Sequence, residues 1–76
     1  MNAIRRKALT KIQKQLEELK DEIENLAEEE QEYYDNMPEG IQDSEKGDIA
    51  LEAIDNLELT ADDIDNALNN IEMAIQ

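Results

Sequence analysis

The sequence of 76 residues contains no cysteine, histidine, tryptophan or phenylalanine, and it has one proline and two glycines. Without cysteine, the chain can form neither a disulfide nor a thiolate metal site. The adjacent Tyr33 and Tyr34 are its only aromatic residues, so few side chains are available to build a thick globular core. A chain of this length forms one small domain at most, and we assign residues 1–76 to that single domain.

Long hydrophobic runs are also absent. No stretch reaches the roughly 20 apolar residues that a membrane-spanning helix needs, and no apolar segment follows the basic residues 5–7 as it does in a signal peptide. We therefore expect a soluble, cytoplasmic protein that does not engage a membrane.

Large apolar residues in the first half recur in alternating steps of three and four, the heptad spacing of a helix that packs along one stripe. They are Leu9, Ile12, Leu16, Leu19, Ile23 and Leu26, and Tyr33 continues the series beyond Glu30. The period-two alternation of a strand is absent. The spacing predicts a helix from about residue 3 to 34, with Asn2 as its N-cap.

A break follows at Pro38. Proline cannot continue a helix from upstream, and it keeps the preceding Met37 out of the helical region. The surrounding aspartate, asparagine and glycine residues favour turn conformations. We predict a turn over residues 35–43, in which Pro38 can open a short helical turn that reaches Gln42.

The second half repeats the heptad spacing, which predicts a helix from about residue 44 to 75, capped by Asp43 or Ser44. Its apolar stripe comprises Ala50, Ile54, Leu57, Ala61, Ile64, Leu68, Ile71 and Ile75. A neighbouring line of small residues consists of Ala53, Thr60, Ala67 and Ala74. Small residues let a second helix approach closely, and Gly47 is expected to leave room for the Tyr33 ring.

Two long helices joined by a short connection must lie antiparallel. The predicted fold class is therefore all-α, a hairpin of two long antiparallel helices of the coiled-coil type. Residues 1–20 carry six basic and two acidic side chains, a net charge of +4, whereas residues 21–76 carry 19 acidic side chains and one lysine, a net charge of −18. The hairpin is expected to place basic residues 5–14 beside acids of the second helix, where each cluster offsets the other's unfavourable helix dipole. These acids are Asp62, Asp63, Asp65 and Glu72.

A lone pair of helices leaves much of each apolar stripe only half covered. Leu59 and Met73 lie off the stripe, on what should be the outer face of the second helix. Two interpretations remain open. They are ordinary exposed aliphatic residues, or they contact another protein or a second copy in a four-helix bundle.

The side chains present do not suggest chemistry. The only hydroxyl groups besides the tyrosines are those of Thr10, Ser44 and Thr60, and there is no histidine or cysteine to complete a nucleophile–base pair. Residues 43–48 lack the order and spacing of a calcium loop. A hairpin offers no sheltered pocket for its carboxylates, of which only Glu30 is expected to be partly enclosed. We predict no enzymatic activity and no catalytic, cofactor or metal site.

The acidic surface is the remaining feature. Over a rod of about 45 Å, a net charge of −18 amounts to one charge per ~2.5 Å, against one per ~1.7 Å in duplex DNA. Such acidity opposes direct binding to nucleic acid, but it suits a basic nucleic-acid channel on another protein. A solvated face that only maintains solubility is the alternative.

Three segments carry a family resemblance: YYDNMPE at 33–39, SEKG at 44–47 and AIDNLE at 53–58. They resemble a group of small acidic proteins encoded in phages and prophages of bacteria, over nearly the whole chain. The resemblance assigns no role to particular residues. It implies a bacterial host cytoplasm, where small acidic phage proteins inhibit host or defence proteins such as CRISPR nucleases and restriction enzymes, some by imitating DNA.

These observations predict a non-enzymatic inhibitor or modulator that binds the basic groove of a nucleic-acid-handling protein, as a DNA mimic of the anti-CRISPR or anti-restriction kind. The predicted contacts are acids and apolar residues on the outer surface and the turn, namely Asp21, Glu22, Glu28, Glu29, Glu32, Tyr34, Met37, Glu52, Asp55, Leu59, Asp62, Asp63, Asp65 and Met73. The alternative is a structural or assembly protein that homodimerises and whose charge serves only solubility.

Overall fold

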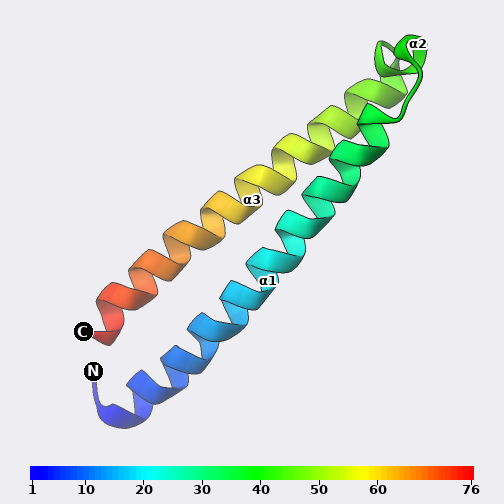
Figure 1. Cartoon of the computed structure of the whole chain (residues 1–76). Helices are drawn as coiled ribbons and strands as arrows, with labels where there is room; N and C mark the ends of the chain where they lie inside the picture. The colour runs from blue at the N-terminus through cyan, green and yellow to red at the C-terminus, as the bar shows by residue number, and fades with distance from the viewer.

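The computed structural model describes all residues, 1–76. It contains three helices: α1 (Ala3–Asp35), α2 (Glu39–Gln42) and α3 (Glu45–Ile75). The two long helices pack side by side and antiparallel, with α2 at the tip and both termini at the open end (Figure 1). The Cα atoms span 58 × 15 × 12 Å. The predicted all-α class and the two long helices that pack together are confirmed.

The ends of α1 follow from local hydrogen bonds. The Asn2 side chain accepts a hydrogen bond from the backbone N–H of Arg5 at 2.8 Å, which is the predicted N-cap. At the other end, the backbone N–H of Asn36 donates to the carbonyl of Glu32. Pro38 then prevents the helix from continuing.

The tip is a compact turn built around α2. The Pro38 carbonyl accepts hydrogen bonds from the backbone N–H groups of Ile41 and Gln42 at 2.8 and 3.0 Å, so the short helical turn reaches Gln42 as predicted. The Gln42 side chain donates to the Tyr34 carbonyl at 2.9 Å and ties α2 to the end of α1. Met37 is buried beneath this turn, with 9% of its surface exposed.

Gly47 is required by α2 and not by Tyr33, so its predicted role was wrong. A Cβ atom at Gly47 would overlap the backbone carbonyl of Gln42, whereas one at Gly40 would meet nothing. Tyr33 remains 45% exposed, and the Lys46 ammonium lies 5.9 Å from its ring centroid. The missing side chain at Gly47 therefore lets the tip fold back onto α3.

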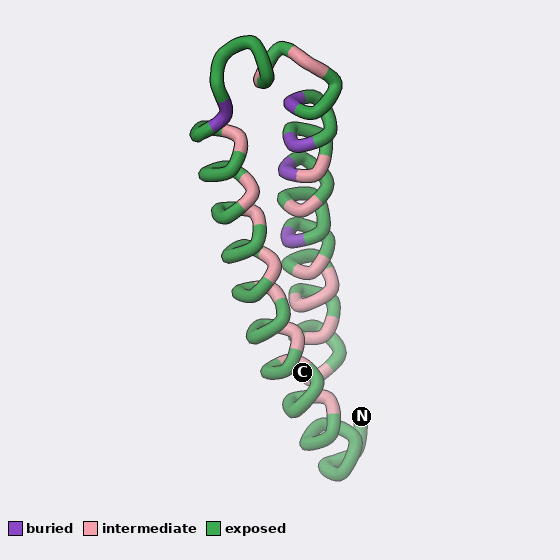
Figure 2. The backbone as a smooth tube through the Cα atoms, turned by 90° about the vertical axis from the view of Figure 1, so that its right-hand side faces the viewer, coloured by how far each residue is buried: buried purple, intermediate pink, exposed green.

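The apolar stripe of α3 is confirmed, because all its predicted residues are buried or half-buried. The most buried are Ala50, Ile54 and Ala61, at 2%, 4% and 6% exposure. They lie between the tip and the middle of the hairpin, and none of the residues nearer the open end is buried (Figure 2). The best-packed core is therefore at the tip end.

Only every second residue of the predicted α1 stripe faces α3. Leu9, Leu16 and Ile23 are half-buried. The residues between them are exposed, namely Ile12 at 47%, Leu19 at 49% and Leu26 at 52%. The positions facing α3 in their place are Gln13, Lys20, Ala27 and Tyr34. Polar contacts from Gln13 and Lys20 to α3 turn α1 about its axis and leave one apolar row outside the contact.

We expect Gly47→Ala to destabilise the fold by about 1–3 kcal/mol, because the new methyl group must displace the α2 backbone. Gly40→Ala is the matched control, since its methyl group meets open space and alanine favours a helix by up to about 1 kcal/mol. Urea denaturation followed by circular dichroism measures both. Equal stability of the two variants would contradict the packing of α2 on Gly47.

Ile54→Ala should lower the free energy of unfolding by about 2–3 kcal/mol, because Ile54 is the most buried large side chain and lies in the best-packed half. Ile49→Ala in the same helix should change it by less than about 0.5 kcal/mol, because Ile49 is 60% exposed. The same urea titrations compare the two. A larger loss at Ile49 than at Ile54 would show that α3 faces α1 with a different side.

Candidate partner-binding surface

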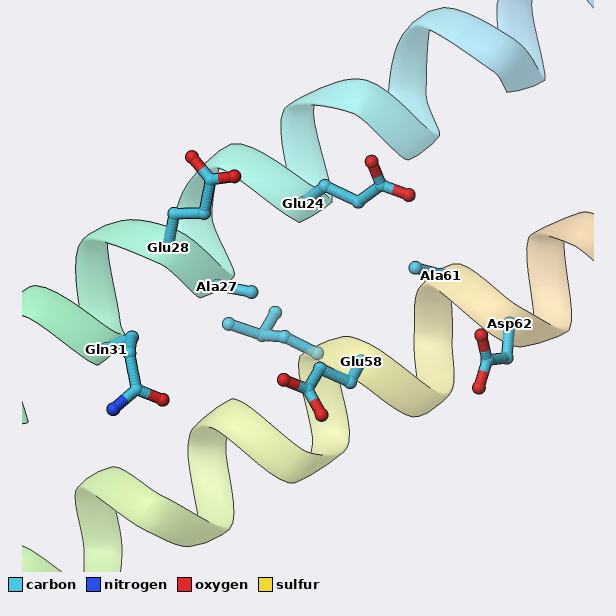
Figure 3. A pocket seen from close by; sticks show the side chains of 8 residues that line it. Glu24, Ala27, Glu28, Gln31, Glu58, Ala61 and Asp62 are labelled. Carbon is cyan, nitrogen blue, oxygen red and sulfur yellow. The ribbon is translucent and has the colours of Figure 1, made fainter.

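One face of the hairpin carries an open groove between α1 and α3, which we call the acidic groove. Its residues are Glu24, Ala27, Glu28 and Gln31 from α1 and Leu57, Glu58, Ala61 and Asp62 from α3. Figure 3 shows Glu24 and Glu28 on one helix and Glu58 and Asp62 on the other. The groove is thus lined by four carboxylates, and those of α1 are 30 or more residues from those of α3 in the sequence.

Small side chains form the floor of the acidic groove. Ala27 and Ala61 extend only a methyl group into the space between the helices (Figure 3). Beside them, Leu57 is half-buried. The four carboxylates flank this apolar floor and are exposed. The groove therefore combines an apolar base with negatively charged edges and is open to solvent.

Lys20 lies at one end of the acidic groove. Its ammonium group contacts Asp65 of α3 at 2.7 Å and Glu24 of its own helix at 3.2 Å. The hydrogen bond that the ammonium donates to Asp65, followed by the one that it donates to Glu24, raises the pKa of Lys20 above 10.5. Further toward the open end, the Gln13 side chain donates to Glu72 at 2.8 Å. These contacts show which residues of α1 and α3 lie level with one another, that is, side by side at the same height along the hairpin axis.

The predicted pairing of basic residues 5–14 with the acids of α3 is largely wrong. Both salt bridges of the chain are made by Lys20, and the Arg6 guanidinium donates instead to the Met1 carbonyl. Since Lys20 is level with Asp65, residues 5–14 lie beside the last turns of α3, where Glu72 is the only acid. The basic end of α1 therefore has no ion-pair partner within the chain.

The predicted partner contacts do not form one surface. Glu28 and Asp62 both line the acidic groove, and Asp65 lies at its end. The other predicted acids are exposed elsewhere around the two helices, namely Asp21, Glu22, Glu29, Glu32, Glu52, Asp55 and Asp63. Glu24 and Glu58 complete the groove and were not predicted. Glu24 follows Lys20 by four residues, a helical ion-pair spacing that could have indicated it.

The predicted apolar contacts also differ in accessibility. Met37 is buried at the tip, so it belongs to the core and is not available as a docking residue. Tyr34 is half-buried, because it is one of the α1 residues that face α3. Leu59 and Met73 are 58% and 73% exposed, as expected for the outer side of α3.

The chemistry of the surface is that of anionic recognition. No group of three or more potential ligands is arranged to hold a metal ion. Glu30 is the only carboxylate that is even half-buried, as predicted. Exposed carboxylates beside a shallow apolar floor can accept hydrogen bonds from arginine and lysine side chains, and arginine can bind a carboxylate through two parallel bonds.

Comparison of the chain with known protein families, curated proteins and solved structures gives no match. The resemblance to phage proteins therefore stays a prediction. None of the helices combines the length and apolar character needed to cross a membrane.

We expect Asp65→Asn to lower the pKa of Lys20 more than Glu24→Gln does, because the hydrogen bond that Lys20 donates to Asp65 is the larger cause of the raised pKa. A raised pKa means that the stabilisation by this cluster is present below pH 10.5 and is lost as the pH rises through the folded-state pKa of Lys20. NMR titration of the lysine side chains measures this, with Asp55→Asn as a control that leaves Lys20 untouched. An unchanged Lys20 pKa in Asp65→Asn would contradict the bridge.

Proposed function

We propose that the chain is a non-enzymatic inhibitor or modulator that binds a basic nucleic-acid-binding groove on another protein, acting in the cytoplasm of a bacterial host. The observation that carries this proposal is the acidic groove, where carboxylates from both helices line one open face. Its partner is a protein whose groove ordinarily holds a nucleic-acid backbone. The inhibitor occupies that groove in place of DNA or RNA.

Charge and shape support this competition. Residues 21–76 carry a net charge of −18, which over the 58 Å length of the hairpin is one charge per ~3 Å. Two helices side by side give a rod roughly 20 Å wide. A rod of this charge is attracted over long distances to a basic channel, which speeds association and makes it dependent on salt.

The acidic groove determines which face of the hairpin binds the partner's basic side chains. Glu24 and Glu28 on α1 and Glu58 and Asp62 on α3 present carboxylates along both edges of one face. Arginine and lysine side chains that normally bind phosphates can bind these carboxylates instead. The apolar floor can accommodate the aliphatic stems of the same side chains.

The partner is first identified by affinity capture from a bacterial lysate, and its binding is then measured in competition with DNA or RNA. We expect the hairpin to displace nucleic acid and its affinity to fall steeply with salt. Neutralising the groove with Glu24→Gln, Glu28→Gln, Glu58→Gln and Asp62→Asn should weaken binding about 10- to 100-fold at low salt.

The matched control removes the same number of charges from the remaining surface, with Glu18→Gln, Glu32→Gln, Glu52→Gln and Asp55→Asn. All four residues are exposed and none lines the acidic groove. We expect this control to bind about as weakly as its reduced net charge requires, and tighter than the groove variant. A partner that binds both variants like the wild type, and that ignores salt, would rule out the proposed mode of binding.

A further inference from the structure

Opposite the acidic groove, α1 exposes a row of large apolar side chains at seven-residue spacing. The row consists of Ile12, Leu19, Leu26 and Tyr33, with 47%, 49%, 52% and 45% of each residue exposed. Each residue of this row follows a residue that faces α3 by three positions. The residues that follow by four positions, Gln13, Lys20 and Ala27, lie instead on the groove side of α1. The row therefore follows the other edge of the contact between the helices.

A row of small side chains on α3 runs beside it. Lys20 is level with Asp65 and Gln13 with Glu72, and an alignment within one residue of this places each large residue next to a small one. The neighbours are Ile12 with Ala74, Leu19 with Ala67, Leu26 with Thr60, and Tyr33 with Ala53. The Lys46 ammonium above the Tyr33 ring confirms that this side of α3 adjoins the row. We call the two rows together the apolar face.

The apolar face is poor in charge compared with the groove side. The residues that flank the two rows are Ile49, Asn56, Asp63 and Asn70 on α3 and Ala8, Gln15, Glu22 and Glu29 on α1, which together include three acids. On the groove side, α3 carries Glu58, Asp62, Asp65 and Glu72. In a chain with 37% charged residues, the two rows themselves carry no acid, so they can lose their water while Glu22, Glu29 and Asp63 stay hydrated at the edges of the face.

We propose that the apolar face binds the same face of a second copy of this chain, giving an antiparallel four-helix bundle. The rows run from Ile12 to Tyr33, about 32 Å at 1.5 Å per residue, and with the 15 Å width of the hairpin this corresponds to about 480 Å² per copy. The total of about 960 Å² is the size of a weak, reversible interface. The midpoint of the large row lies between Leu19 and Leu26, level with the midpoint of the small row between Thr60 and Ala67. A two-fold axis at this level therefore places the large row of one copy against the large row of the other, and the small row against the small row.

The charges of α1 select the antiparallel orientation. Five basic residues at its start have no partner in their own chain apart from the Met1 carbonyl, which binds Arg6; they are Arg5, Arg6, Lys7, Lys11 and Lys14. Residues 21–35 carry eight acids and no basic residue. The two-fold axis places Ile12 against Tyr33 of the second copy, and hence the basic start of each α1 beside the acidic end of the other. A parallel pair would set acid against acid.

The inference is independent of the proposed function, because the acidic grooves face outward in this dimer. Sedimentation from about 5 to 500 µM should show a dimer that dissociates on dilution. Leu19→Asp with Leu26→Asp should raise the dissociation constant at least about 100-fold. The matched control, Leu59→Asp with Met73→Asp, alters two exposed apolar residues off the apolar face, at 58% and 73% exposure, and should remain dimeric. Circular dichroism checks that each variant keeps its helices.

A charge exchange tests the orientation without touching apolar residues. Lys11→Glu and Glu32→Lys, both at exposed positions, should each weaken the dimer about 10-fold, and the double variant should restore it. A wild type that stays monomeric at the highest concentration overturns the proposal. So does a dimer that Leu59→Asp with Met73→Asp disrupts and Leu19→Asp with Leu26→Asp does not. Failure of the charge exchange to restore the dimer overturns the antiparallel orientation.

Discussion

The orientation of α1 about its own axis, in which Lys20 bridges Asp65 of α3 and Glu24 of its own helix, decides what each side of the hairpin presents. The α1 sequence offers one broad apolar stripe, and packing alone would centre that stripe on the partner helix. Lys20 and Gln13 instead form polar contacts with α3 and hold α1 turned to one side. The acidic groove exists because this rotation brings Glu24 and Glu28 to the edge of α3, and the apolar face exists because it moves Leu19 and its row away from α3.

The tip end of the hairpin provides the fully buried residues that the rest of the contact between the long helices lacks. Along most of the hairpin the residues of α1 that face α3 are only half-buried, whereas Met37, Ala50 and Ile54 are buried in the half nearest the tip. Gly47 permits this by leaving room for the α2 backbone. The hairpin can therefore remain folded although both of its sides present partly exposed rows, because the buried residues at the tip hold the two long helices together at that end.

Much of this fold follows from the sequence, because heptad spacing, Pro38 and the Asn2 cap each act through neighbouring residues. The α3 stripe was also predicted, since α3 has one apolar side and no competing polar residue on it. The rotation of α1 was not, because a periodic pattern shows which residues share a side but not which polar contacts compete with them. The site could not be predicted for the same reason. Glu24 and Glu58 line one groove only because of how α1 and α3 are aligned along the hairpin, which the contact of Lys20 with Asp65 shows. The role of Gly47 likewise depends on how the α2 backbone folds back onto α3.

The concentration of burial at the tip also bears on the order in which the chain folds. The tip joins residues close in sequence, since only residues 36–44 separate α1 from α3, so closing it costs the least conformational entropy. Contacts nearer the termini bring together residues that are far apart, such as Gln13 and Glu72. Each added turn of helix pairing then shortens the loop that the next must close. We expect the hairpin to assemble as a zipper that starts at Pro38 and Gly47 and proceeds toward the termini, which would open first on unfolding.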